Sequence, residues 1–231
     1  MNRGIAVVSV IALVALAASL TAQSQTDGRF DFKVRSDFFT GMSGNSAAFE
    51  RAMKVCEETL AANPKHAEAL VWHGGGLFFM SGREFMKGNV EKGLELYQRA
   101  VKEMDEAVRL APRDVSVLIP RGSTYIGATW EMPPTPAKAL LEIGVSDYEK
   151  TLEIQQPYFK DLSTHSRGEL LLGLAGGWSR LGNTDKAKTY FERMARELPG
   201  SAYDKKARAW LANDPESRAQ PFYNCTGCHV P

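Results

Sequence analysis

The stretch GELLLGLAGGWSRLGNTDKAKTYFERMARELPGS, from Gly168 to Ser201, decides the fold class of this chain. Its first half carries large apolar and small residues at helical spacing over Leu171–Trp178, and its second half does the same over Ala187–Met194. A turn is expected at Gly182–Asn183, and Pro199 is expected to end the second half. We therefore expect two antiparallel helices that pack closely on each other and dock on a further pair.

This unit resembles the tetratricopeptide repeat (TPR), a helix–turn–helix unit of about 34 residues, in its length, in the small residue Ala175 and in its closing proline. Looser units earlier in the chain close at Pro64, Pro112 and Pro157. These prolines lie further apart than the repeat length. We therefore expect the extra residues, at 81–89 and 130–137, to form long loops between the two helices of a unit.

The expected fold is all-α, because apolar residues recur at helical spacing throughout and no stretch alternates as a strand does. The resemblance implies a TPR-like superhelix of helical hairpins over residues 30–212, with about three to four repeats. First helices of units are expected at Ala67–Met80 and Val115–Thr129. A last helix at Ala202–Leu211 would cover the apolar face of the array, as terminal repeats require.

The charges nearly cancel, with 28 lysine and arginine residues against 27 aspartate and glutamate residues. This balance argues against nucleic acid as a partner and against a charged membrane surface. The chain has three cysteines, too few for a fold held together by disulfides, so its stability must come from apolar burial. The sequence shows no catalytic constellation, and we do not expect an enzyme.

Residues 1–24 have the pattern of a secretory signal peptide. Arg3 is followed by an uncharged apolar run over Ile5–Leu20, and small residues then appear at Ala22 and Ser24. The alternative is a membrane anchor that is not cleaved. With cleavage, the mature protein would be periplasmic or extracellular and would not be held in a membrane.

The composition changes after Leu211, and residues 213–231 are expected to form an extended tail. This tail contains Cys225, Cys228 and His229, which make the C-x-x-C-H signature of c-type haem attachment. The two thiols would form thioether bonds to haem c, and the imidazole of His229 would bind one face of the iron. The alternatives are a plain disulfide, a redox pair without haem, and a zinc site, which would need a further ligand.

The second axial ligand of such a haem is not evident in the tail, which lacks methionine and has only Val230 and Pro231 after the motif. The roughly 12 residues before the motif span up to about 40 Å when extended. We therefore expect the ligand to come from His165 or His73, from another subunit or from solvent. The competing interpretations are a capping or surface role for His165 and a hydrogen-bonded interior role for His73.

Two or three small residues stand together in the middle of successive first helices, at Gly74–Gly76, Gly122–Ser123 and Gly176–Gly177. Glycine inside a helix costs about 1 kcal/mol of stability relative to alanine, so we expect these glycines to have a structural or functional role. Close helix packing explains one residue at each site. We expect the other to face a groove that admits a partner segment or the tail of the protein itself.

These observations favour a secreted or periplasmic mono-haem c-type cytochrome on a TPR scaffold, in which electron transfer is coupled to protein docking through the groove. One alternative is a binding or assembly module of the cell envelope without redox function. Another is a subunit of a head-to-tail assembly, a homo-oligomer in which the haem tail of one copy enters the groove of the next.

Overall fold

The structure is a computed structural model that describes residues 29–130 and 132–214. Within these residues it is all-α and has no strand, which confirms the expected fold class. The α-helices are α2 (Asp31–Met42), α3 (Ser46–Ala62), α4 (Ala67–Met86), α5 (Val90–Leu110), α6 (Val115–Ala128), α7 (Pro134–Gln155), α8 (Thr164–Arg180), α9 (Thr184–Glu197) and α10 (Ala202–Leu211). A 3₁₀ helix, η1 (Gln156–Asp161), follows α7.

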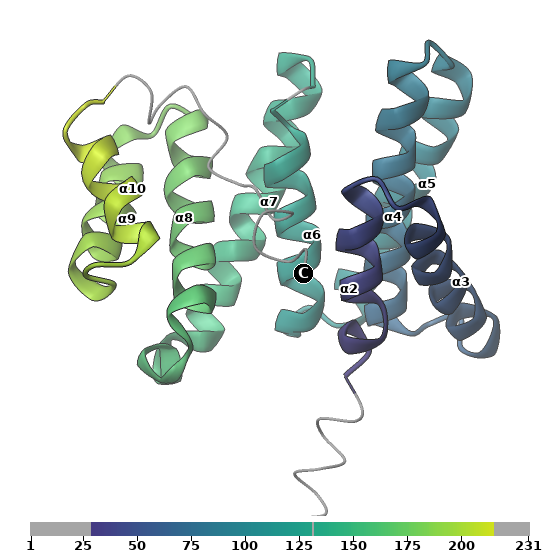
Figure 1. The fold of residues 1–231 in the computed structure, drawn as a ribbon, viewed down its shortest axis with the longest axis horizontal. Coiled ribbons are helices and arrows are strands. Elements are labelled where there is room, and N and C mark those ends of the chain that lie inside the picture. The colour runs from purple at the N-terminus through teal and green to yellow at the C-terminus, as the bar shows by residue number, and fades with distance from the viewer. Residues whose placement is uncertain (1–28, 131, 215–231) are drawn as a thin grey trace, which may run out of the picture.

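Consecutive helices pack as hairpins, namely α2 with α3, α4 with α5, α6 with α7, and α8 with α9. Figure 1 shows these hairpins side by side along the long axis of the molecule. The first helices of the hairpins also contact one another in sequence, α2 with α4, α4 with α6, and α6 with α8. They thus form one face of the array, and α10 packs on α9 at its end, as predicted for a closing helix.

The helix boundaries follow from local side-chain chemistry. Asn45, Asp114, Ser163, Asn183 and Ser201 stand at N-cap positions, where each side chain accepts a hydrogen bond from a backbone N–H of the first turn. The predicted turn of the clearest unit is present where expected. Gly182 there adopts a positive φ of 79°, a conformation that glycine accepts without steric cost.

The long loops predicted inside the middle units were wrong. Residues 81–86 continue α4, which was expected to end at Met80, so the connection to α5 shrinks to residues 87–89. Helix α4 ends at Met86, and Gly88 just beyond it takes a positive φ of 82°, a conformation that often ends a helix. Likewise, α7 begins at Pro134, a position in the first turn that proline tolerates, so 130–137 is only partly loop.

The buried apolar side chains form two clusters along the array. The first is built mainly from α2 to α5 and includes Phe38, Phe49 and Met104. The second is built mainly from α7 to α10 and includes Leu171 and Phe191. Helix α6 contributes to both clusters and therefore joins the two halves of the array.

Candidate functional site

A groove of about 720 Å³ runs across the starts of the first helices of all four hairpins. Residues of α2, α4, α6 and α8 line it, together with the end of α7. Its volume lies within the range of about 300–1,000 Å³ that is usual for ligand-binding sites. The groove is therefore the candidate binding site of the scaffold.

Apolar side chains of α2, α4 and α6 make much of the groove wall. Phe39 and Trp72 pack edge to face, with ring centroids 6.4 Å apart. Ile119 lines the same groove from α6 and remains 37 % exposed, which is high for a large aliphatic side chain. This part of the groove can accept apolar side chains of an occupant.

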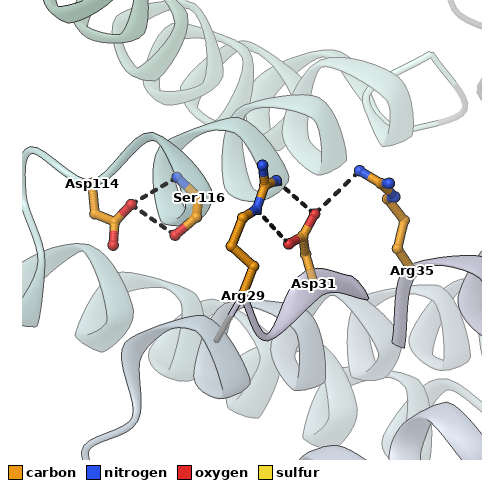
Figure 2. Close-up of polar contacts among 5 residues, drawn as sticks. All are labelled: Arg29, Asp31, Arg35, Asp114 and Ser116. Carbon is orange, nitrogen blue, oxygen red and sulfur yellow. Dashed lines mark hydrogen bonds and ion pairs between the residues drawn. The ribbon is translucent and has the colours of Figure 1, made fainter. Parts of the chain in front are cut away.

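A cluster of charges lies at the start of α2. Asp31, whose side chain is only 7 % exposed, accepts hydrogen bonds of 2.9 Å and 2.8 Å from Arg29 and one of 3.1 Å from Arg35. Figure 2 shows this cluster beside the start of α6, where Asp114 accepts hydrogen bonds from the backbone N–H and the hydroxyl of Ser116. The two helix starts thus place two guanidinium groups and two carboxylates in one groove.

Glu68 and Trp72 add polar atoms that no described residue satisfies. Oε2 of Glu68 and the indole Nε1 of Trp72 are buried and, among the described residues, have no hydrogen-bond partner. Burial raises the pKa of the Glu68 carboxyl, and the charges of Asp114 and Asp31 raise it further. His66 lowers this pKa in part, but no lysine or arginine among the described residues forms an ion pair with Glu68.

The other end of the groove carries His165, in the first turn of α8, as an exposed side chain. The hydroxyl of Tyr203 donates a hydrogen bond of 2.7 Å to Glu169 and lies 2.9 Å from Nδ1 of His165. A hydroxyl has one proton, so Tyr203 accepts the hydrogen bond that His165 Nδ1–H donates. In neutral imidazole the lone pair then lies on Nε2.

His73 lies elsewhere, in the interior between α3, α4 and α5, and is 1 % exposed. Its Nδ1 is 2.5 Å from Oε2 of Glu103, and its Nε2 is 3.8 Å from Oε1 of Glu57. This arrangement agrees with a hydrogen-bonded interior histidine. His165 and His73 are thus in different environments, and His165 is the one that lines the groove.

Cys56 is fully buried in α3, and no described residue forms a disulfide with it. Burial raises the pKa of its thiol to about 12, so the thiolate, which is the reactive form, is suppressed near neutral pH.

The small residues in the first helices serve packing more than the groove. A Cβ atom added at Gly74 would lie 2.7 Å from Met104, and one at Gly177 would clash with the side chain of Val145. Ser123 does line the groove, as expected for the second small residue of its pair. Gly75 instead faces Thr124 of α6, at 3.5 Å from an added Cβ atom, and is not among the residues that line the groove.

The predicted haem ligands Cys225, Cys228 and His229 lie outside the described residues, as do the predicted signal peptide and most of the tail. The described residues hold no group of three histidine, cysteine or acidic side chains placed to bind a metal ion. None of the described helices combines the length and the apolarity that a membrane crossing needs.

Sequence reasoning found His165 but missed Arg29, Asp31, Glu68 and Trp72. These residues come from helix starts that are distant in the sequence, and only the packing of α2, α4 and α6 brings them together.

No family of known proteins matches the chain, and no curated protein is similar to it.

Proposed function

We propose that this protein is a mono-haem c-type cytochrome of the cell envelope. Its helical-hairpin scaffold binds the protein that is the redox partner of the haem. The observation that carries the proposal is the motif Cys225-x-x-Cys228-His229 in the sequence. Haem c supplies one-electron redox chemistry when it is attached. The expected signal peptide supports the periplasm or the extracellular space as the location, where such attachment takes place.

The surroundings of His165 support it as the second axial ligand. An iron ligand must present an unprotonated nitrogen, and metal-binding histidines usually donate their other N–H to an oxygen atom. The hydrogen bonds from His165 to Tyr203 and from Tyr203 to Glu169 meet both conditions, because they keep the proton on Nδ1. His73 is the weaker candidate, because its ring is buried between Glu103 and Glu57.

The first test is covalent attachment. Protein matured with a c-type haem attachment system should carry haem that survives acid–acetone extraction and denaturing electrophoresis. The double variant Cys225→Ala/Cys228→Ala should lose this haem. Cys56→Ala is the matched control, since its thiol is buried in the scaffold, and it should keep the haem. Haem retained by the double variant would refute the proposed attachment site.

The second test concerns the axial ligand. His165→Ala should convert a low-spin absorption spectrum to a high-spin one at every protein concentration, whereas His73→Ala should leave it low-spin. Tyr203→Phe keeps the ring but removes the hydroxyl that holds the His165 proton. The low-spin fraction of its spectrum should therefore fall, because the imidazole loses the hydrogen bond that fixes its tautomer and ring orientation. An unchanged spectrum in His165→Ala would exclude this ligand.

The second candidate function is a binding or assembly module without redox work. The groove favours it, because its unsatisfied polar atoms and apolar wall fit a docked segment whether or not haem is present. Absence of haem after maturation would select this function. A low-spin spectrum that fades on dilution would instead select the head-to-tail assembly, in which the ligand belongs to a second copy.

A further inference from the structure

We propose that the groove end formed by α2, α4 and α6 binds a segment of a partner protein that carries lysine or arginine next to apolar residues. This inference deepens the docking half of the proposed function, and it does not require the haem. It rests on three features of the described residues: the charge of the groove, its unsatisfied atoms and its apolar wall.

The groove carries more negative than positive charge. Its lining includes the carboxylates of Asp31, Glu68, Asp114 and Glu169 and the guanidinium groups of Arg29 and Arg35. Both arginines donate hydrogen bonds to Asp31, and among the hydrogen bonds of the described residues neither arginine reaches Glu68. Glu68 is thus the carboxylate that a cation from outside would compensate best.

The unsatisfied atoms specify how an occupant is held. Glu68 already accepts a hydrogen bond from the backbone of Asp31, which leaves Oε2 for a cationic donor. Trp72, one turn further along α4, has an indole N–H that suits a backbone carbonyl oxygen of an extended peptide. One ammonium or guanidinium group and one carbonyl group of the same segment would satisfy both atoms.

The apolar wall indicates which type of residue lies next to the basic residue in the bound segment. Phe39, Trp72 and Ile119 line the groove next to the acidic end, and Ile119 is partly exposed. Burial of apolar side chains on this wall would supply affinity, and the charged pair would supply direction and specificity.

Two other occupants fit less well. The described residues do not bring three acidic groups into the arrangement that a metal ion needs, whereas a long side chain can reach one carboxylate from a distance. The tail of the protein itself carries no excess of positive charge, because its one arginine, Arg218, stands against Asp214 and Glu216. The charge of the groove therefore favours a separate, basic partner segment.

The test uses the full chain and two fluorescein-labelled peptides that are capped at both ends. One has a Leu-Lys-Arg-Leu centre, and the other has Leu-Glu-Glu-Leu in an otherwise identical sequence. Fluorescence anisotropy should show saturable binding of the basic peptide, an affinity at least about tenfold lower for the acidic one, and weaker basic-peptide binding at higher salt. Glu68→Gln should lower the affinity for the basic peptide about tenfold or more.

Glu91→Gln is the matched control, since Glu91 is exposed near the start of α5 and does not line the groove. It should bind as the wild type does, and circular dichroism should show that both variants remain folded. Equal binding of the two peptides, no binding of the basic one, or an unchanged affinity in Glu68→Gln would overturn the inference. Haem content is measured on the same samples. A failure to bind the basic peptide can therefore be distinguished from a failure of haem attachment.

Discussion

At the scale of single residues, the groove contains a carboxyl group placed at some cost to stability. Glu68 is partly buried and close to Asp31 and Asp114, and its pKa is raised for these reasons. The folded protein therefore holds this proton more tightly than the unfolded chain does. Its stability should fall as pH rises from the ordinary value of 4.5 through the raised pKa of the folded state.

Glu68→Gln removes this titration and should change the pH dependence of unfolding. As the pH rises from 4 to 7, the melting temperature of the variant should increase relative to that of the wild type. The reason is that position 68 carries an ionisable carboxyl group only in the wild type. Thermal unfolding followed by circular dichroism measures the difference. A difference that is the same at both pH values would show that Glu68 ionises as freely as in the unfolded chain.

At the scale of elements, close contact of α4 with α5 depends on the missing side chain of Gly74. A Cβ atom at this position would lie 2.7 Å from Met104 Cγ and 3.0 Å from the carbonyl oxygen of Ala100. The backbone of α5 cannot move away without disturbing the hairpin. At Gly75, by contrast, the nearest atom would be Thr124 Oγ1 at 3.5 Å, which is an ordinary contact.

Gly74→Ala and Gly75→Ala should therefore differ in their effect on the free energy of unfolding. Both gain about 1 kcal/mol of helix propensity, but Gly74→Ala also overpacks the hairpin at a cost of about 1–3 kcal/mol. We expect Gly75→Ala to raise the free energy of unfolding and Gly74→Ala to leave it unchanged or lower it, as measured by urea denaturation. A Gly74→Ala variant as stable as Gly75→Ala would mean that α4 and α5 separate easily.

At the scale of the whole molecule, an ion-pair network joins the two halves of the array at α6. Arg121 donates two hydrogen bonds of 2.7 Å to Asp147 of α7 and one of 2.9 Å to Asp105 of α5. The side chains of Arg121 and Asp147 are 12 % and 5 % exposed. Burial raises the pKa of Asp147, and the bonds from Arg121 oppose this rise.

Arg121→Leu should be strongly destabilising, because it leaves Asp147 as a buried charge without its partner. The expected loss is about 3–5 kcal/mol, and the double variant Arg121→Leu/Asp147→Leu should recover much of it. Arg109→Leu, which breaks a pair with the more exposed Glu106, is the control and should cost at most about 1 kcal/mol. Equal losses in the two single variants would show that the network does not hold the halves together.

The sequence alone determined the helical hairpins, because the spacing of apolar residues and the caps are local. The clearest unit, the closing helix Ala202–Leu211 and the turn at Gly182 were all predicted from it. The length of α4 was not predicted from the sequence, because no local signal shows that residues 81–86 continue the helix. Tertiary packing supports this last part of α4.

The haem motif is likewise a local pattern, so the sequence suffices to predict Cys225, Cys228 and His229, and these remain predictions. Only the tertiary structure distinguished His165 in the groove from His73 in the interior. It also brought Asp31, which lies far from it in the sequence, next to Glu68. The physical reason is that a groove between hairpins is made by contacts between helix starts that are distant along the chain, and residue spacing within one helix does not record which helix starts will meet.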